Sequence, residues 1–333
     1  MSFFLPHVPE LPSNLSFDGQ VAAITGSNGG LGYEAALQLA QRNIATLILA
    51  VRRVDAGQKA KAEILADPIV RKRSTPPKIV VYALDMERPS SIASFADKIY
   101  ADFSELHILL LNAGLGTLNY VQTPEIHSEQ MFQVNFASNV LLGTRLLPLL
   151  RATGQRSGTP SHLSLVGSRM ARESNTFARK PVAPTINIFD YMNDKARFNG
   201  FGRYSDTKML AALWIAEVAA HVPSSEVIVN GCCPGMTRTG LQSRQPFAVR
   251  VLVGAFGVIH RARSAPVGGS VLVNGVSTGK ESHGVLVWDM EPKGLEFLQT
   301  AEGKRWQKKL WKETLAVTEQ WSAGATAEAG LDS

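Results

Sequence analysis

The stretch Val21–Leu37 reads V-A-A-I-T-G-S-N-G-G-L-G-Y-E-A-A-L. Small and β-branched residues run up to Gly26, and after a glycine-rich loop the apolar residues recur at helical spacing. A strand, a tight glycine loop and a helix start suit the pyrophosphate of a dinucleotide. Glycines let the backbone approach the phosphates, and the helix N-terminus stabilises their charge. The stretch therefore predicts an α/β fold with a doubly wound parallel sheet and a dinucleotide at this loop.

The glycines of the loop fit two spacings. Gly26, Gly30 and Gly32 fit T-G-x-x-x-G-x-G, whereas Gly26, Gly29 and Gly32 fit T-G-x-x-G-x-x-G. The two spacings are typical of enzymes with different reactions. Because the loop alone leaves both open, the rest of the chain has to decide between them.

The composition is that of an ordinary globular protein. The chain has 333 residues, of which 45% are hydrophobic and 19% charged, enough for one large α/β domain. The net charge of +6 is scattered, and its densest run, 71–73, falls in an expected solvent-exposed loop. We therefore expect no nucleic-acid partner, since a basic balance equally suits an anionic cofactor.

The two cysteines, Cys232 and Cys233, are adjacent, and neighbouring residues of a strand point to opposite faces. This arrangement favours neither a disulfide framework nor a metal site, so we expect a reducing, cytoplasmic compartment. The N-terminus has no basic region ahead of an apolar run, and no stretch reaches the apolar length of a spanning helix. The sequence thus predicts a soluble protein without a signal peptide.

The pattern predicts one domain of about seven strands over residues 19–320. An irregular arm is expected at 1–18 and a disordered tail at 321–333. Within the domain, 169–201 is expected to be an irregular insertion. Residues 240–265 are expected to form a lid over the substrate, because the segment is apolar with basic flanks. Peripheral contact with a membrane is the alternative for that segment.

The strand Ala45–Val51 ends in Arg52 and Arg53. A carboxylate at this position usually binds the 2′-hydroxyl of a nucleotide, whereas a 2′-phosphate requires arginine. The pair therefore favours NADP(H) over NAD. The next strand ends in Asp85 and Met86. We expect Asp85 to accept a hydrogen bond from the adenine amino group, to cap the helix that follows, or to do both.

Polar and small residues recur after later strands and on one helix. Asn112, Ala113 and Gly114 follow the fourth expected strand, where small residues let the chain pass close beneath a cofactor. Asn135 falls on the core-facing side of the helical stretch Pro124–Leu150, where a buried amide needs partners. A purely structural hydrogen bond is the alternative to a functional role for Asn135.

Two stretches of the chain read Y-x-x-x-K. Tyr204 and Lys208 open a long helical pattern and share one helix face, whereas Tyr191 and Lys195 lie closer in sequence to Ser168, which follows the fifth expected strand. The earlier pair is followed by A-R-F-N-G-F-G, which ends a helix at once. Only the later pair therefore lies on a sustained helix, 36 residues after Ser168 at Tyr204.

Together these motifs resemble the short-chain dehydrogenase/reductase family over about Ser16–Trp288, which implies a Rossmann-type fold. The resemblance favours the classical members, with T-G-x-x-x-G-x-G, over the extended epimerases and dehydratases. Asn28 and Arg52 are similar to the retinol-dehydrogenase-like branch, which prefers NADPH. The segment G-V-S-T-G-K-E-S-H-G-V-L-V-W-D, which ends at Asp289, resembles fungal members, many of which reduce secondary metabolites.

The resemblance implies hydride transfer with Tyr204 as the proton donor to the substrate oxygen. Lys208 would lower the pKa of the Tyr204 phenol by its charge. Ser168 would hydrogen-bond the substrate, Asn135 would support a water linking the lysine to solvent, and Thr239 would hold the carboxamide. The implied cofactor contacts are Gly26, Ser27, Asn28, Gly30, Leu31, Gly32, Arg52, Asp85, Met86, Asn112, Ala113, Gly114, Tyr204, Lys208, Pro234, Gly235, Thr237 and Thr239.

Three positions depart from the family pattern. Leu111 replaces the first asparagine of N-N-A-G, Ser138 stands where glycine is common, and Gly167 stands where another serine is usual. None of these changes removes a catalytic group, so activity is expected. The resemblance also makes a homo-oligomer a candidate assembly, although the C-terminal extension could cover the usual interface.

The sequence thus predicts NADPH-dependent reduction of a carbonyl, or the reverse oxidation, on an apolar small molecule. A catalytically silent NADP-binding regulator is the first alternative. An extended-type epimerase or dehydratase is the second, and Arg52 and Arg53 argue against the NAD that it would retain.

Overall fold

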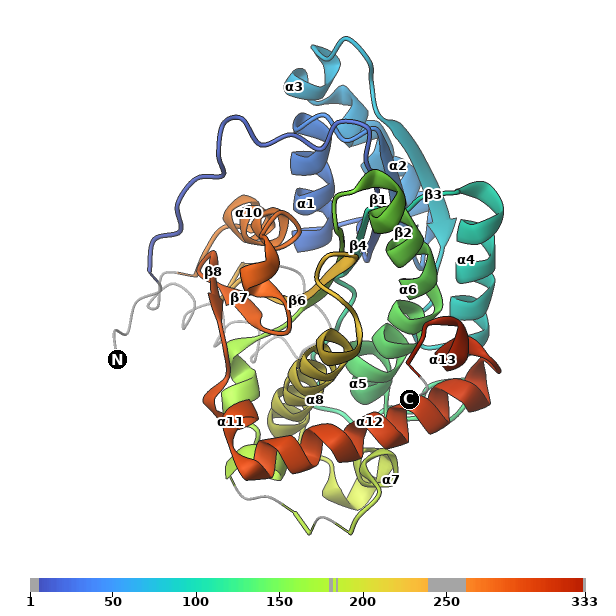
Figure 1. The fold of residues 1–333 in the computed structure, drawn as a ribbon, viewed down its shortest axis with the longest axis vertical. Helices are drawn as coiled ribbons and strands as arrows, with labels where there is room; N and C mark the ends of the chain where they lie inside the picture. The colour runs from blue at the N-terminus through green and yellow to red at the C-terminus, as the bar shows by residue number, and fades with distance from the viewer. Residues whose placement is uncertain (1–5, 180–181, 184, 239–261, 332–333) are drawn as a thin grey trace.

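The computed structural model describes residues 6–179, 182–183, 185–238 and 262–331. It contains an eight-stranded sheet with the order β3-β2-β1-β4-β5-β6-β7-β8 (Figure 1). The strands are β1 (Val21–Thr25), β2 (Thr46–Val51), β3 (Lys78–Ala83), β4 (Ile108–Leu111), β5 (Ser161–Val166), β6 (Val227–Cys233), β7 (Leu286–Trp288) and β8 (Glu291–Lys293). Neighbouring strands pair in parallel except β7 and β8, which are antiparallel. The Rossmann-type doubly wound sheet predicted from the sequence is confirmed.

Helices cover both faces of this sheet. The long ones are α1 (Gly30–Gln41), α2 (Val54–Ala66), α4 (Pro89–Asp102), α6 (Ser138–Ser157), α8 (Gly200–His221), α10 (Ala265–Gly275) and α12 (Ala301–Trp321). Helices α1, α2 and α10 cover one face of the sheet, and α4, α6 and α8 cover the other (Figure 1). Apolar side chains of each set form a core cluster with the sheet, and Leu11 and Phe17 of the N-terminal arm belong to the first cluster. Among the described residues, no helix combines the length and the apolar character needed to cross a membrane.

Burial on both faces explains the apolar central strands. The residues of β4 and β6 are buried along the whole length of each strand. The polar side chain of Asn230 in β6 is satisfied there: its Oδ1 accepts from Ser164 Oγ at 2.7 Å, and its Nδ2 donates to the Gly275 carbonyl at 2.9 Å. A buried amide is stable in this core because it has these partners.

The helix expected over 124–150 begins later and is interrupted. It consists of α5 (Gln130–Phe132), the π-helix η1 (Gln133–Ala137) and α6. Residues 122–129 form a turn instead, in which the Thr123 N–H donates to the Ser128 carbonyl at 2.8 Å. The Glu129 carboxylate then caps the helix by accepting from the N–H groups of Met131 and Phe132.

The insertion at 169–201, expected to be irregular, contains short helices: η2 (Arg169–Glu173), η3 (Asn175–Arg179), α7 (Ile188–Asn193) and η4 (Lys195–Arg197). Phe177 and Ile188 are fully buried, and the Phe177 ring packs edge-on against Trp306 of α12 with centroids 5.2 Å apart. The insertion is therefore part of the main core. The expected lid and alternative membrane contact at 240–265 fall largely on 239–261, outside the described residues.

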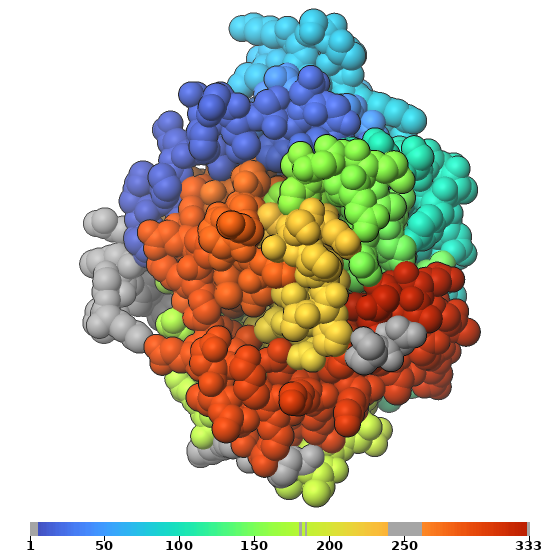
Figure 2. Space-filling model, viewed as in Figure 1, coloured from blue at the N-terminus to red at the C-terminus, as the bar shows by residue number. Residues whose placement is uncertain are grey.

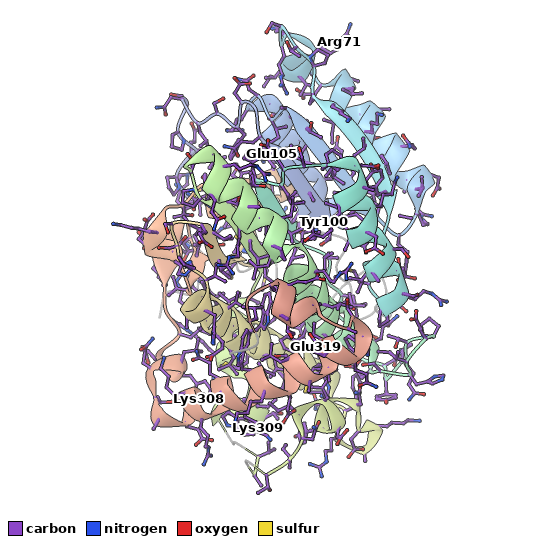
Figure 3. All side chains as sticks on the ribbon, turned by 45° about the vertical axis from the view of Figure 1, so that its right-hand side comes forward. Arg71, Tyr100, Glu105, Lys308, Lys309 and Glu319 are labelled. Atoms are coloured by element: carbon purple, nitrogen blue, oxygen red, sulfur yellow. The ribbon has the colours of Figure 1, made fainter. Side chains whose placement is uncertain are left out.

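The prediction of a disordered tail at 321–333 is wrong for its described part. After α11 (Glu296–Gln299), α12 crosses the outer side of α8 and α6, and α13 (Ala325–Glu328) folds back on α6 (Figures 1 and 2). Ala329 and Leu331 are fully buried. Glu319, at the end of α12 in Figure 3, accepts from the N–H groups of Gly324 and Thr326 at 2.7 and 2.8 Å. The small alanine and glycine residues of 321–331 are typical of a linker, but packing against the rest of the fold orders them.

The hairpin β7–β8 adds an eighth strand to the seven or so expected. Its two turn residues, Asp289 and Met290, have φ of +54° and +64°. Two consecutive left-handed residues form the tight turn that matches the twist of a hairpin. The sequence D-M lacks the glycine that usually marks such a turn, which explains why the strand was missed.

Two smaller helices complete the described chain, α3 (Pro68–Arg71) and η6 (Lys280–Ser282). The basic run 71–73 starts at the last residue of α3 and is only partly the exposed loop that was expected. Arg71 points outward at the periphery in Figure 3, but the Arg73 guanidinium donates to the carbonyls of Ala40 and Ile44, both at 2.9 Å. Arg73 thus joins α3 to the end of α1.

Candidate active site

A cavity of about 520 Å³ opens at the carboxyl ends of the strands. It lies where the strand order reverses between β1 and β4, the switch point at which open α/β sheets bind ligands. The cavity is lined by Gly26, Asn28, Gly29, Gly30, Leu31, Ala50, Arg52, Arg53, Leu84, Asp85, Met86, Glu87, Asn112, Ala113, Gly114, Leu115, Val134, Val166, Gly167, Ser168, Tyr204, Lys208, Pro234, Gly235 and Thr237.

The glycine loop conforms to one of its two possible spacings. Gly26 and Gly30 have φ of +67° and +55°, which favours glycine. A Cβ on Gly32 would lie 2.4 Å from Asn112 Nδ2, so no larger residue fits there. Gly29 has an extended backbone and no atom within 4 Å of an added Cβ. Glycine is therefore required at the three positions of T-G-x-x-x-G-x-G.

Asn112 supports this loop from below. Its Nδ2 donates to the Thr25 carbonyl at 2.8 Å, and the Ala113 N–H donates to Thr25 Oγ1 at 2.8 Å. These bonds join the end of β4 to the end of β1. They place the small side chain of Ala113 and the backbone of Gly114 on the cavity wall.

Arg52 and Arg53 form one end of the cavity together with Glu87. Arg52 Nη1 lies 3.1 Å from Glu87 Oε1, which also accepts from Gln130 Nε2 at 2.9 Å. The half-exposed Arg52 guanidinium is thereby held at the cavity edge. Asp85 Oδ1 accepts from the Glu87 N–H at 3.0 Å, and the N-cap residue of α4 is not Asp85. Capping of that helix by Asp85 is thus excluded, while the adenine contact stays a prediction.

Three predicted catalytic residues meet at the other end. Ser168 follows β5, and Tyr204 and Lys208 lie on successive turns of α8. The Ser168 hydroxyl lies close enough to the Tyr204 phenol to favour a lower pKa for it. Lys208 Nζ donates to the Val166 carbonyl at 2.7 Å and lies 5.6 Å from the centre of the Tyr204 ring. The half-buried tyrosine is thus placed between a hydroxyl and an ammonium group.

Burial, rather than the lysine charge, dominates the acidity of these groups. Burial raises the pKa of Tyr204 to about 12, although the nearby Ser168 hydroxyl works in the opposite direction. Burial lowers the pKa of Lys208 to about 8. Removing water disfavours both phenolate and ammonium. Burial acts against the expected lowering of the Tyr204 pKa by Lys208, which stays a prediction.

Asn135 lies behind the cavity wall, in the π-helix η1. Its Oδ1 accepts from the Leu115 N–H at 2.8 Å, and its Nδ2 donates to the Leu115 carbonyl at 2.9 Å and to Thr207 Oγ1 at 3.3 Å. The buried amide thus joins the segment after β4 to α8. This brace accounts for its polar side chain, and support of a water by Asn135 stays a prediction.

All the predicted cofactor contacts line the cavity except Ser27, Gly32 and Thr239. Gly32 lies beneath the loop, and the buried Ser27 hydroxyl has no hydrogen-bond partner among the described residues. Thr239 lies outside the described residues. Tyr191 and Lys195 are also absent from the described lining: Lys195 is exposed, and the Tyr191 ring is covered by the Arg197 guanidinium at 4.9 Å.

Several lining residues are not among those predicted from the sequence, and Glu87 and Val166 matter most. Glu87 continues the polar end of the third strand, directly after Asp85 and Met86, so its position was a usable signal. Val166 contributes its backbone carbonyl, which holds Lys208. No pattern of side chains reveals such a contact.

These residues fit a nicotinamide dinucleotide. The cavity is large enough for an extended ligand, the glycine loop lets phosphates approach, and arginines stand at one end. The buried Ser27 hydroxyl beside that loop has no hydrogen-bond partner in the part of the chain that the structure describes, and a buried donor normally needs one. Across the ranges that the structure describes, no three His, Cys, Asp or Glu side chains group as metal ligands would.

Comparison with known proteins agrees with this geometry. A family model described as short chain dehydrogenase matches residues 20–160. A short chain dehydrogenase of Arthrobotrys oligospora is 37% identical over 316 residues, covering 95% of this chain and 97% of the relative. One of Aspergillus niger is 36% identical over 318 residues, covering 95% and 96%. The structure of NADPH-dependent 3-quinuclidinone reductase from Rhodotorula rubra shares the fold, with a TM-score of 0.59 and 20% identity over 85% of this chain and 96% of that one.

Proposed function

Because this chain belongs to the short-chain dehydrogenase/reductase family and is thus an oxidoreductase that uses a nicotinamide cofactor, we propose that it reduces a carbonyl with NADPH. The observation that carries the proposal is the convergence of Ser168, Tyr204 and Lys208 on one wall of the cavity. The reverse oxidation of an alcohol would use the same groups. Membership of the retinol-dehydrogenase-like branch stays a prediction.

The side chains divide the chemistry at the substrate oxygen. Bound NADPH would supply the hydride. The Ser168 hydroxyl donates a hydrogen bond to the carbonyl oxygen, and Tyr204 Oη donates the proton that converts the developing alkoxide to an alcohol. The ammonium of Lys208, on the same helix face, stabilises the phenolate that is left. The apolar surroundings that raise the Tyr204 pKa keep the phenol protonated before transfer.

The preference for NADPH is supported by Arg52 and Arg53 at one end of the cavity. A guanidinium can bind a 2′-phosphate through two parallel hydrogen bonds. Glu87 occupies Arg52 Nη1 and leaves the rest of that fork at the cavity edge. Because the Glu87 carboxylate lies so near the proposed phosphate site, the preference for NADPH should be measured directly, with NADH as the competing cofactor.

An apolar substrate is supported by two exposed apolar side chains that lie close in sequence to the catalytic groups. Met170, two residues after Ser168, is 41% exposed, and Phe201, one turn before Tyr204, is 67% exposed. A contiguous apolar surface near a reactive site is typical of a ligand-binding groove. The fungal relatives, and the resemblance of the segment ending at Asp289 to fungal members of the family, make a secondary metabolite the proposed substrate class.

The proposal is tested by following NADPH and NADH oxidation with a panel of apolar ketones, aldehydes and quinones. Wild type is compared with Tyr204→Phe and Tyr191→Phe, with cofactor binding measured in each. Loss of turnover by about 100-fold or more in Tyr204→Phe alone, with binding retained, is the expected result. Loss in Tyr191→Phe alone would move the site to the earlier pair.

Two further outcomes address the alternatives. NADPH binding without turnover by any variant, on the panel and on a fungal metabolite extract, would favour a cofactor-binding regulator. Tightly retained NAD in the purified protein would favour an epimerase or dehydratase. Either result would overturn the proposed reductase.

A further inference from the structure

Asp289, at the turn of the β7–β8 hairpin, joins two arginines from distant parts of the chain. Its Oδ2 accepts from Arg169 Nη2, and its Oδ1 accepts from Arg263 Nη2. The carboxylate is only 12% exposed and the Arg263 side chain 5%. Among ion pairs between described residues, Asp289 is the carboxylate partner of both arginines. It comes from the W-D segment that the proposed chemistry leaves unused.

The first arginine belongs to the segment that carries the catalytic serine. Arg169 directly follows Ser168, and its guanidinium also lies 5.5 Å from the Trp288 ring of the same hairpin. The Ser168 Oγ accepts from the Met170 N–H at 3.2 Å, so Arg169 sits inside the turn that orients this hydroxyl. The hairpin thus holds one side of the catalytic end of the cavity.

The second arginine holds the facing side. Arg263 Nη1 donates to the Pro234 carbonyl at 2.9 Å, and Nη2 also donates to the Pro6 carbonyl at 3.0 Å. Its backbone pairs with the same segment: the Arg263 N–H donates to the Met236 carbonyl, and its carbonyl accepts from the Arg238 N–H, both at 2.9 Å. This segment supplies Pro234, Gly235 and Thr237 to the cavity lining.

We propose that Asp289 is a positioning residue that fixes the spacing between Ser168 and the wall formed by residues 234–237. The inference rests on the proposed reductase function, because that wall is where the nicotinamide would lie. Removing the carboxylate leaves two neighbouring guanidinium groups, one of them buried, without their shared counter-charge. They repel each other, and the two sides of the cavity separate. A displacement of about 1 Å at a reacting centre can cost about 100-fold in rate.

Asp289→Asn is the direct test, since asparagine tolerates the left-handed backbone as well as aspartate and removes only the charge. Glu291→Gln is the matched control. Glu291 lies on the same hairpin, is 69% exposed and pairs only with Lys293 among the described ion pairs. If Asp289→Asn fails to fold, Arg263→Lys replaces it, because it keeps the charge but loses the fork that reaches Pro234.

Turnover supplies the first readout. We expect Asp289→Asn to lower kcat by about 10- to 100-fold with less than a threefold change in KM for the carbonyl substrate. In a Ser168→Ala background the same change should lower kcat less than threefold, because the group that Asp289 positions is already gone. A general structural role would lower kcat equally in both backgrounds and would overturn the inference.

Cofactor binding supplies a readout that needs no substrate. We expect Asp289→Asn to weaken NADPH at least fivefold by fluorescence titration, and adenosine 2′,5′-bisphosphate, which lacks the nicotinamide, less than twofold. Glu291→Gln should change neither. If the protein prefers NADH, only the cofactor proposal fails, and NADH with 5′-AMP repeats the test. Equal weakening of both ligands, or of neither, would overturn the role of Asp289.

Discussion

The chain contains two Y-x-x-x-K stretches, and their positions in the fold differ. Tyr204 and Lys208 lie on the long helix α8 and line the cavity. Tyr191 lies on the short helix α7, and Lys195 is exposed beyond its end. Each tyrosine ring has a cation near it, the buried Lys208 at 5.6 Å and the exposed Arg197 at 4.9 Å. Both stretches thus have the motif and a cation near the tyrosine ring, but only in the later one is that cation the lysine of the motif.

Burial and neighbours distinguish the two stretches. Lys208 is 6% exposed, lines the cavity and donates to the Val166 carbonyl at the end of β5. Lys195 follows Asp194, which binds Arg197 at 2.9 Å at the surface. Spacing alone puts tyrosine and lysine on one helix face. The pair forms part of a site only where another element packs against that face, as the end of β5 does at Lys208.

The largest expected effect is on turnover. Lys208→Met should lower kcat by about 100- to 1,000-fold, because the phenolate left on Tyr204 loses its cation. Lys195→Met, the same substitution in the other stretch, should change kcat less than twofold. Steady-state NADPH oxidation with the substrate found in the panel measures both. Similar losses in the two variants would remove the distinction between the stretches.

The next effect is on the pH dependence of stability. Burial lowers the pKa of Lys208 to about 8 from 10.5. Between these values the unfolded chain holds the proton and the folded one does not, so this group makes stability rise with pH from about 8 to 10.5. Urea unfolding should show that rise in wild type relative to Lys208→Met. Lys195→Met should keep it, and a flat difference between wild type and Lys208→Met would contradict the burial of the charge.

A smaller effect is expected at the aspartates inside the two motifs. Asp206 is buried and accepts from Ser174 Oγ at 2.7 Å and Thr176 Oγ1 at 2.6 Å, which joins α8 to the insertion. Asp206→Asn should lose about 1–3 kcal/mol of the free energy of unfolding. Asp194→Asn, at a surface pair, should lose less than about 1 kcal/mol. Urea unfolding at pH 7 compares them, and a reversed order would show that the insertion is anchored elsewhere.

The smallest effect concerns the cation over Tyr191. Arg197→Met removes an exposed contact worth about 0.5 kcal/mol, together with the surface pair to Asp194. We expect a loss of free energy of unfolding near that size and an unchanged kcat. A large loss of turnover would show that the earlier stretch contributes to the site after all.

Much of the nucleotide end of the cavity could be predicted from the sequence, because local rules govern it. Gly26, Gly30 and Gly32 are required by φ or by close contact, and Asn112 follows a strand whose end is set by hydrophobic pattern. Glu87 was not predicted, although it directly follows Asp85 and Met86 at the end of the third strand. The tail at 321–331 was wrongly predicted, because alanine and glycine become ordered there only by packing on α6.

The sequence by itself determined the order of strands and helices, the glycine loop and the candidates Ser168, Tyr204 and Lys208, since these depend on neighbours within a few residues. The tertiary structure decided which tyrosine faces the cavity, that burial opposes the expected lowering of the Tyr204 pKa, and that Asp289 joins the two sides of the cavity. Those results depend on contacts between residues far apart in the chain. Desolvation and long-range ion pairs exist only once the segments have packed together.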